Sequence, residues 1–395
     1  MLPLVDRLLK HDQAIVRKKT VMLLHHFFLI KNSSVTDYIP RFRTALCDKD
    51  PSVMAATLHV FFDLARVDPH PYKDLVSSFV SILKQVTEHR LPRDFDYHRV
   101  PAPWIQIKIL KILAILGHAD QASSEQTYEV LLECMRRADT GINVGYAIIY
   151  ECVRVVTSIY PNPTLLDAAA AAIARFIEAE NQNLRYLGVT GLTSIVKDHP
   201  KYAMDHQKTV IECLADPDES LKRKTLDLLF HMTNGVNVGT IVSKLLEHLK
   251  EATDRFLRRA LVHRIAAAAE KFAPDNGWYV SVVVQLMEMG GDLVEQEVVQ
   301  SLIRLVAEGE GDDDEEADDD LRSDAVETML QLIDKPALPN TLLQVMFWVL
   351  GEYGYLAESM KVAEITDKVC LIAGRASLSP AARSCALSAM LKLTA

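Results

Sequence analysis

The sequence predicts an all-α fold built from repeated pairs of helices, and three observations support this prediction. One amphipathic pattern, with an apolar or small residue at i, i+4, i+7, i+8 and i+11, marks a helix with one buried face. The pattern recurs along the chain, beginning at residues 16, 53, 105, 148, 184, 221, 257, 298, 342 and 382. Most intervals between these starts are close to the ~40 to 47 residues of two-helix armadillo and HEAT-type repeats. The composition, 49% hydrophobic with only 15 Gly and 16 Pro, suits helices joined by short turns. We therefore predict an armadillo/HEAT-like α-solenoid over residues 1–395, which needs no division into classical domains.

The copy in residues 216–232 shows the pattern most completely. Asp216 is expected to cap the helix, Pro217 to take its first position, and Glu219 to complete an arrangement like a capping box. The buried face that follows consists of Leu221, Thr225, Leu228, Leu229 and Met232. A helix is therefore expected to begin at this cap.

The other copies follow in chain order and vary in quality. They open at Val16, Val53, Ile105, Ile148, Leu184, Leu257, Val298, Leu342 and Ala382. Arg264 interrupts one copy, and Gly188 and Gly191 supply only small contact positions in another. Between the copies, apolar residues at helical spacing predict partner helices at 36–47, 72–87, 124–137, 164–178, 202–214, 238–250, 277–289, 322–334 and 359–374.

The interval between residues 53 and 105 is the longest because it contains an extended loop at residues 89–104. The loop combines three prolines with several basic residues and with the aromatic residues Phe95, Tyr97 and Trp104. We favour an ordered connection in which Trp104 plugs the next helix pair. The alternative is that the loop contacts a partner protein.

The negative charge of the chain is concentrated in one segment, residues 308–320. This segment holds ten carboxylates and no basic residue, and the carboxylates outside it equal the 43 basic residues of the chain. A block of like charge cannot bury itself, so we predict a solvated, mobile insertion. Cation binding is a less favoured reading, because the segment lacks the bidentate Glu and Gly turn of a calcium loop. The neutral remainder argues against nucleic-acid binding.

The sequence shows no catalytic, cofactor-binding or metal-binding site, and we predict that the protein is not an enzyme. His25-His26 does not form an HExxH pair, and no nucleophile elbow, Walker loop or dinucleotide fingerprint occurs. The cysteines have no CxxC or metal-ligand spacing, and are expected to be reduced core residues of a cytosolic protein: Cys47, Cys134, Cys152, Cys213, Cys370 and Cys385.

The sequence contains no apolar run of ~20 residues, so no membrane-spanning helix is expected. The first residues show an amphipathic pattern rather than a signal peptide. This pattern is typical of the second half of a repeat pair, and we expect earlier repeats to precede it.

Basic residues occupy the same point in three copies of the pattern, at 17–19, 222–224 and 258–259. One hypothesis is that they line a groove for an acidic peptide, a phosphoinositide head group or another subunit. We favour the simpler interpretation, in which they keep one face of each helix in water or pair with the acidic turn before it.

Several segments, in order, resemble the large subunits, or adaptins, of heterotetrameric vesicle-coat adaptor complexes. They are Ala14-Ile-Val-Arg-Lys-Lys19, Asn183-Leu-Arg-Tyr-Leu-Gly188, Cys213-Leu-Ala-Asp-Pro-Asp-Glu-Ser-Leu-Lys-Arg-Lys224, Ala268-Ala-Glu-Lys-Phe-Ala-Pro274 and Trp348-Val-Leu-Gly-Glu-Tyr-Gly354. Within that family, Pro101-Ala-Pro-Trp-Ile-Gln-Ile-Lys-Ile-Leu110, Tyr150-Glu-Cys-Val153 and Ile159-Tyr-Pro-Asn-Pro163 are most similar to the epsilon chain of the fourth adaptor complex. The gamma and alpha chains are the near alternatives.

The resemblance implies a non-enzymatic adaptor subunit that scaffolds its partners for cargo selection and protein transport from the trans-Golgi network. The implied partners are a beta-type large chain, a medium chain and a small chain, together with an Arf-type GTPase and cargo tails in the full-length protein. The implied location is the cytoplasm, peripheral on Golgi and coated-vesicle membranes. By comparison with a family trunk, the chain is expected to lack the first repeats and the C-terminal hinge and ear. No binding residue of the family is assigned to a position here. The alternative function is another helical-repeat scaffold, such as a nuclear-transport receptor or a phosphatase scaffold.

Overall fold

The computed structural model describes residues 2–30, 37–309 and 315–395, and these residues form a succession of helices. Within them, strand-like pairing is confined to one isolated bridge between Tyr97 and Val100. The helices belong to two compact units, residues 1–202 and residues 203–395. That all residues 1–395 form one continuous solenoid stays a prediction.

Every copy of the sequence pattern lies on a helix, and we call these the frame helices. In unit 1 they are α2 (Ala14–Ile30), α4 (Pro51–Val67), α6 (Pro103–Leu116), α9 (Asn143–Ser158) and α11 (Gln182–Asp198). In unit 2 they are α13 (Glu219–Met232), α15 (Arg255–Phe272), α17 (Gln296–Glu308), α19 (Asn340–Tyr353) and α21 (Pro380–Leu393). The all-helical prediction is confirmed for the described residues.

The segments between the frame helices also form helices, which we call the partner helices. In unit 1 they are α1 (Leu2–Leu9), α3 (Ile39–Leu46), α5 (Val76–Thr87), α7 (Gln121–Glu125), α8 (Tyr128–Ala138) and α10 (Pro163–Ile177). In unit 2 they are α12 (Gln207–Glu212), α14 (Val238–Glu251), α16 (Asn276–Gly290), α18 (Glu315–Leu332) and α20 (Val362–Ala373). Short 3-10 turns, such as η2 (His70–Leu75), η3 (Arg93–Phe95) and η5 (Cys213–Ala215), join several of them.

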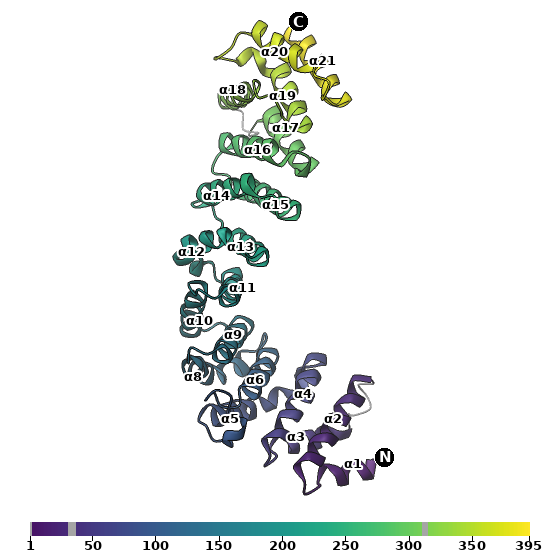
Figure 1. The fold of residues 1–395 in the computed structure, drawn as a ribbon, viewed down its shortest axis with the longest axis vertical. Helices are drawn as coiled ribbons and strands as arrows, with labels where there is room; N and C mark the ends of the chain where they lie inside the picture. The colour runs from purple at the N-terminus through teal and green to yellow at the C-terminus, as the bar shows by residue number, and fades with distance from the viewer. Residues whose placement is uncertain (1, 31–36, 310–314) are drawn as a thin grey trace. The chain divides into compact units, whose positions relative to one another are not determined.

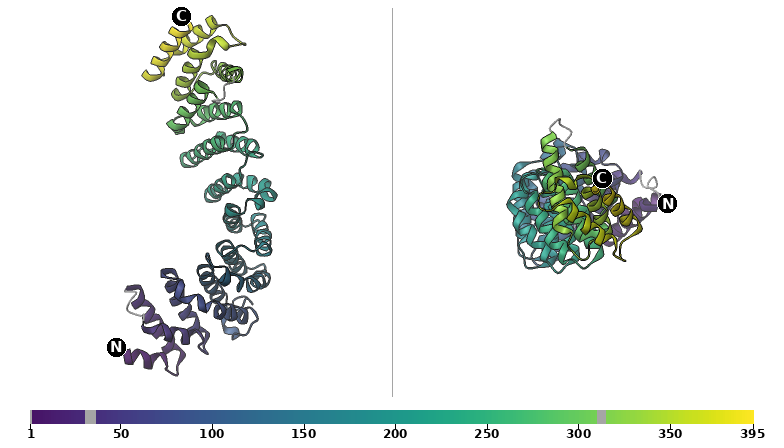
Figure 2. Two further views of the ribbon diagram at one scale, coloured as in Figure 1. Left: turned by 180° about the vertical axis from the view of Figure 1, so that it is seen from behind. Right: turned by 90° about the horizontal axis from the view of Figure 1, so that it is seen from above.

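Within each unit most frame helices pack on the next one along the chain, as Figures 1 and 2 show. In unit 1, α2 contacts α4, α4 contacts α6, α6 contacts α9, and α9 contacts α11. In unit 2, α13 contacts α15, and α17 and α21 both contact α19. Each frame helix also packs against a neighbouring partner helix, for example α10 against α11 and α14 against α15. This arrangement of successive helix pairs is that of stacked two-helix repeats.

Threonine at the second position of the pattern forms a hydrogen bond from its hydroxyl group to a backbone carbonyl of the same helix. Thr57 and Thr225 are fully buried, and each donates from Oγ1 to the carbonyl four residues earlier, at 2.9 Å in both cases. Thr20 makes the same bond to Val16 at 2.8 Å. A buried hydroxyl therefore costs little at this position, because its partner belongs to the same helix.

The start of α13 differs from the sequence prediction. Asp218, not Asp216, is the N-cap, because its carboxylate accepts a hydrogen bond from the Ser220 N–H at 2.8 Å. The helix begins at Glu219, so Pro217 lies before it and Glu219 does not complete a capping box. Asp216 instead ends η5 and accepts from the Asp218 N–H at 2.9 Å. Two aspartates separated by Pro217 thus form the turn, and the Asp216 carboxylate holds the backbone of Asp218, which caps the helix.

The acidic segment is partly helical. Residues 315–320 form the beginning of α18, which starts seven residues before the predicted partner helix at 322–334. Residues 310–314 lie outside the described residues. Arg322 donates to a carboxylate oxygen of Asp319 at 3.0 Å and to the Val306 and Ala307 carbonyls, so a basic residue just after the segment ties it to the end of α17. That the whole segment 308–320 is a mobile insertion stays a prediction.

The extended loop at residues 89–104 is ordered, but Trp104 is not a plug. Its side chain is 62% exposed, and its ring lies 5.8 Å, between centroids, from the exposed ring of Tyr97. Four non-glycine residues of this loop have a positive φ, namely His89, His98, Arg99 and Ala102. The loop keeps this backbone because Tyr97 pairs with Val100 and Gln106 donates to the Pro101 carbonyl at 2.6 Å. The prediction that Trp104 plugs the next helix pair is therefore wrong, because its side chain faces solvent.

The two irregularities in the pattern have clear structural roles. A Cβ at Gly188 would lie 2.7 Å from the Ile177 backbone nitrogen, and one at Gly191 would lie 2.5 Å from Ile173, so glycine lets α11 approach α10 closely. Arg264 of α15 pairs with Asp227 of α13, and its guanidinium carbon lies 4.9 Å from the centroid of the Phe230 ring. The arginine thus bridges two frame helices through charge and ring contact.

Candidate partner-binding surfaces

The described residues contain no cluster of three or more His, Cys, Asp or Glu side chains arranged to hold a metal ion. Among the same residues, no helix is both long and apolar enough to cross a membrane. His25, one of the paired histidines of the sequence, places Nε2 2.7 Å from a carboxylate oxygen of Asp63.

The cysteines are only partly core residues. Cys134, Cys152 and Cys213 are buried, as predicted, and burial raises the pKa of the Cys152 thiol well above its ordinary value. Cys47 and Cys370 are exposed, which corrects the prediction for these two positions. Cys47 lies just after the last turn of α3, where the side chain leaves the apolar stripe.

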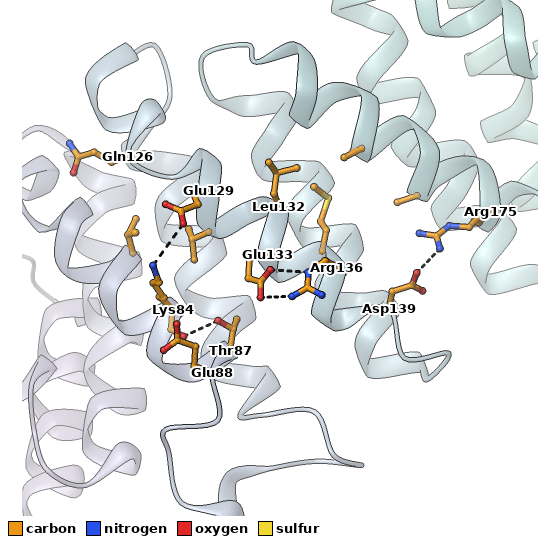
Figure 3. Close-up of a pocket in the computed structure, with 15 residues that line it drawn as sticks. Lys84, Thr87, Glu88, Gln126, Glu129, Leu132, Glu133, Arg136, Asp139 and Arg175 are labelled. Carbon is orange, nitrogen blue, oxygen red and sulfur yellow. Dashed lines mark hydrogen bonds and ion pairs between the residues drawn. The ribbon is translucent and has the colours of Figure 1, made fainter.

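A groove of about 770 Å³ lies in unit 1 among the partner helices α5, α8 and α10. Figure 3 shows charged side chains along its rim. They neutralise one another: Lys84 lies 3.8 Å from Glu129, Arg136 2.8 Å from Glu133, and Arg175 2.5 Å from Asp139. The hydrogen bonds from Arg136 and Arg137 lower the pKa of Glu133 to about 2. The floor is formed by small and apolar residues, among them Val80, Val130, Ala168 and Ala172. Because most of the rim charges are paired with one another, the groove shows no strong excess of either sign.

The basic residues of the three repeated positions are mainly structural. Arg17 and Arg258 bond to backbone carbonyls at the ends of neighbouring helices, Arg17 to His11 and Asp12 and Arg258 to Leu249, Ala252 and Met289. In the 222–224 triplet, Lys222 pairs with Glu219 at 2.9 Å, Arg223 with Asp254 at 3.8 Å and Lys224 with Asp227 at 4.0 Å. The favoured interpretation, pairing with nearby acidic residues, agrees with these contacts. The structure does not gather these three positions into one groove within a unit.

A second surface in unit 1 was not recognised from the sequence. It is formed by the solvent-facing side chains of α2, α4, α6 and α9 together with the end of the 89–104 loop, and we call it the frame-helix face. It contains two recesses, a mostly apolar one of about 530 Å³ between α2, α4 and the loop, and a basic one of about 630 Å³ between α4, α6 and α9. Figure 1 shows the four helices one after another in unit 1.

The apolar recess is bordered by exposed aromatic and aliphatic groups. Met22, Leu29 and Trp104 line it and are 47%, 59% and 62% exposed. Lys18, His25, His26 and His59 also line it, and no carboxylate does. Burial first, and then the charges of Lys108 and His25, lower the pKa of His59, which favours its neutral form.

The basic recess surrounds one buried carboxylate. The Glu151 side chain is only 8% exposed, and one of its oxygens lies 3.9 Å from Lys111 Nζ and 3.6 Å from Arg154 Nη1. Burial raises the pKa of Glu151, although the neighbouring cations oppose this shift. Arg66 also lines the recess, and Lys108 lies beside it on α6. The count of basic and acidic residues over the whole chain did not reveal this local excess of cations, because it sums the charges of all surfaces.

The family model described as adaptin N-terminal region matches residues 1–395, which is the whole chain. The chain belongs to the adaptin family. Among curated proteins, it is 47% identical over 395 residues to "AP-4 complex subunit epsilon" of Arabidopsis thaliana and 43% identical over 396 residues to "AP-4 complex subunit epsilon-1" of Homo sapiens. These alignments cover 100% of the chain but only 42% and 35% of the two relatives, so the chain spans less than half of their length. The resemblance to adaptins of the epsilon type is thereby confirmed.

A gamma chain is a more distant relative of this adaptin. "AP-1 complex subunit gamma" of Dictyostelium discoideum is 27% identical over 410 residues, covering 99% of the chain and 45% of that protein. The difference from the 43–47% found for epsilon chains decides between the epsilon and gamma alternatives.

Two solved structures confirm the solenoid fold of this adaptin. A structure described as a homology model of the full-length AP-3 complex in an intermediate open conformation gives a TM-score of 0.63 at 19% identity, covering 98% of the chain and 68% of the matched chain. A crystal structure of importin beta gives 0.54 at 12% identity, covering 100% and 52%. At these identities the likeness shows the fold alone, so the importin match does not favour a nuclear-transport function. Adaptins are a family of non-enzymatic coat proteins, in agreement with the prediction from the sequence.

Proposed function

We propose that this adaptin is part of the large, epsilon-type subunit of a vesicle-coat adaptor complex and acts as a non-enzymatic scaffold in vesicle trafficking. One observation carries the proposal, the 47% identity to an AP-4 epsilon subunit along all 395 residues. The fold supports it in a general way, because stacked repeats offer long surfaces rather than a single enclosed site. In unit 1, such surfaces are the groove of Figure 3 and the frame-helix face.

The partners of the scaffold are proposed to be a beta-type large chain, a medium chain and a small chain. For the full-length protein, we propose an Arf-type GTPase and the cytosolic tails of cargo proteins as further partners. The proposed location is peripheral, on the Golgi, the trans-Golgi network and coated vesicles.

The test is affinity purification of the tagged full-length gene product from its own cells, followed by mass spectrometry. We expect a beta-type large chain, a medium chain and a small adaptor chain to be recovered together, at similar abundance. The matched control is the same tag on another helical-repeat protein of the same cells. Recovery of a phosphatase catalytic subunit or of a nuclear-transport cargo, without adaptor chains, would refute the proposal.

The location is tested separately by imaging the tagged full-length protein and by separating membranes from cytosol. We expect perinuclear Golgi-like structures and a membrane fraction that increases with a non-hydrolysable GTP analogue, because Arf-type GTPases recruit in their GTP form. A membrane fraction that resists extraction at high salt and alkaline pH would contradict peripheral association.

A further inference from the structure

We propose that the frame-helix face of unit 1 binds an extended acidic segment of a partner protein, with an apolar side chain of that segment anchored beside Trp104. The inference rests on the proposed scaffold function, because it assigns a chemistry to one partner contact of the scaffold. It follows from three features of the face, which are its excess of cations, the contact of two of them with one aromatic ring, and the adjoining apolar recess.

The frame-helix face carries more positive than negative charge. Its cations are Lys18, Arg66, Lys108, Lys111 and Arg154, whereas its carboxylates are Asp63 and Glu151. Arg66 lies 3.9 Å from Asp63, and Lys111 and Arg154 lie 3.9 and 3.6 Å from Glu151. Among the described residues, Lys18 and Lys108 form no ion pair, so the five cations face only two carboxylates. By contrast, the charges around the groove of Figure 3 are paired with one another. A local excess of this kind attracts and orients an anionic partner.

Two of these cations lie against one aromatic ring. Lys108 Nζ lies 4.4 Å and the Arg66 guanidinium carbon 5.6 Å from the centroid of the Phe62 ring. Lys108 is half-buried, and burial first, and then the charge of Lys111, lower the pKa of Lys108. A half-buried cation loses less hydration when a carboxylate binds it.

The apolar recess can hold one apolar side chain of the partner segment. Trp104 and Tyr97 present exposed rings at its edge, and the recess of about 530 Å³ continues along Ala55, Ala56 and Ile105. Tryptophan is enriched among the residues that dominate binding energy at interfaces. The recess lies at the N-terminal ends of α4 and α6, and the basic recess at their C-terminal ends. A partner that fits both is therefore a linear segment with an apolar group at one end and carboxylates at the other.

The buried Glu151 favours an extended segment over a compact polyanion. Its carboxylate lies between Lys111 and Arg154 and offsets part of their charge, so the cations left for a ligand are spread along the helices rather than gathered in one dense cluster. Carboxylates spread along a chain avoid this position and still reach Lys108 and Lys18. An acidic peptide segment therefore suits the face better than a phosphorylated lipid head group.

The experiment uses the full 395-residue chain as a soluble fusion and a fluorescein-labelled synthetic peptide, Phe-Leu-Gly-Glu-Asp-Glu-Asp-Glu, with its reversed sequence as a second probe. Anisotropy titration at low ionic strength is expected to show binding that weakens steadily as salt is added. Lys108→Glu with Lys111→Glu is expected to weaken binding about tenfold or more, and Trp104→Ala about tenfold. Lys244→Glu with Lys250→Glu, the same charge change on two exposed residues of α14, is the matched control and is expected to change binding less than about twofold.

Two further measurements guard against variants that fail to fold. Circular dichroism spectra of all variants must match the parent, and Glu151→Gln is expected to bind the peptide about threefold more tightly because it removes a repelling charge. Equal binding by the parent and by the double charge variant, or weaker binding by Glu151→Gln, would overturn the inference. Binding of phosphoinositide vesicles in place of the peptide would do the same.

Failure of this inference differs from failure of the proposed function. If the parent protein recovers adaptor subunits but the peptide does not bind, only the frame-helix face was misassigned. If no adaptor subunit is recovered, the scaffold function itself is wrong, whatever the peptide does.

Discussion

Arg17 and Asp48 form an ion pair with two hydrogen bonds in which the side chains are only 8% and 11% exposed. Nε and Nη2 of Arg17 donate to the two carboxylate oxygens of Asp48 at 2.7 and 2.8 Å, and Nη1 donates to the carbonyls of His11 and Asp12. Asp48 in turn accepts a hydrogen bond from the Asp50 N–H in the turn before α4. One guanidinium group therefore joins the turns that precede two successive frame helices.

We predict that Asp48→Asn destabilises the chain by roughly 3 kcal/mol, because it leaves a nearly buried guanidinium without its counter-charge. Asp74→Asn is the control, since it removes the partner of Arg43 at a site where the carboxylate is 62% exposed. Its cost should stay below about 1 kcal/mol. Urea unfolding followed by circular dichroism measures both, and equal losses would contradict the structural role of the Arg17 pair.

The acid sensitivity of α7 should depend on Asp120. A hydrogen bond from Lys73, and then those from the Ser123 N–H and hydroxyl, lower the pKa of Asp120 from 3.8 to about 2. A carboxylate with a lowered pKa in the folded state adds stability above its unfolded pKa, and this stability is lost as the pH falls toward the folded value. The difference in melting temperature between the parent and Asp120→Asn should thus be constant at neutral pH and shrink between about pH 4 and pH 2. A difference that is the same at pH 3 and at pH 7 would exclude this explanation.

Glu151 should show the opposite pH dependence. Burial raises its pKa, so its contribution to stability is most favourable at low pH and is lost as the pH rises through the folded pKa. Glu151→Gln should therefore melt at a higher temperature than the parent at pH 7, and the two should converge near pH 4. Differential scanning fluorimetry across this range is the measurement. A variant that melts lower at pH 7 would show that Lys111 and Arg154 outweigh burial.

Glycine at position 188 should be required for the packing of α11 on α10. Gly188→Ala places a methyl group 2.7 Å from the Ile177 backbone nitrogen, which cannot move alone, and is expected to cost about 1–3 kcal/mol. Gly239→Ala is the control, because no atom lies within 4 Å of its added methyl group. The control should be neutral or up to about 1 kcal/mol stabilising, since alanine favours helix. Equal effects in urea unfolding would show that the close helix contact is unimportant.

The helices were predictable because each one buries a stripe of apolar residues, and the regular spacing of these residues is visible in the sequence. The turn at residues 216–218 was not predictable, since Asp216 and Asp218 both suit an N-cap. Only the hydrogen bonds show which one caps, because the Asp216 carboxylate accepts from the Asp218 N–H and the Asp218 carboxylate accepts from the Ser220 N–H. Trp104 was misplaced because an aromatic residue next to prolines gives no sign of which side of the loop it faces.

The frame-helix face was missed for a different reason. Lys108, Lys111 and Arg154 lie on two helices separated by a pair of partner helices, and only packing brings them together. A count of charges over the whole chain cannot detect such a cluster. The family, by contrast, was recognisable from short ordered segments and was confirmed along all 395 residues.

The exposure of Trp104 gives the protein its own optical reporter. The chain has 3 tryptophans, and Trp104 is the one in unit 1, while Trp278 and Trp348 lie in unit 2. Replacing the latter two with phenylalanine leaves a single fluorophore at the edge of the apolar recess. Its emission should be red-shifted and readily quenched by acrylamide in the free protein, and should shift to the blue when a ligand covers it. Occupancy of this surface then becomes visible by ultraviolet spectroscopy without any attached dye.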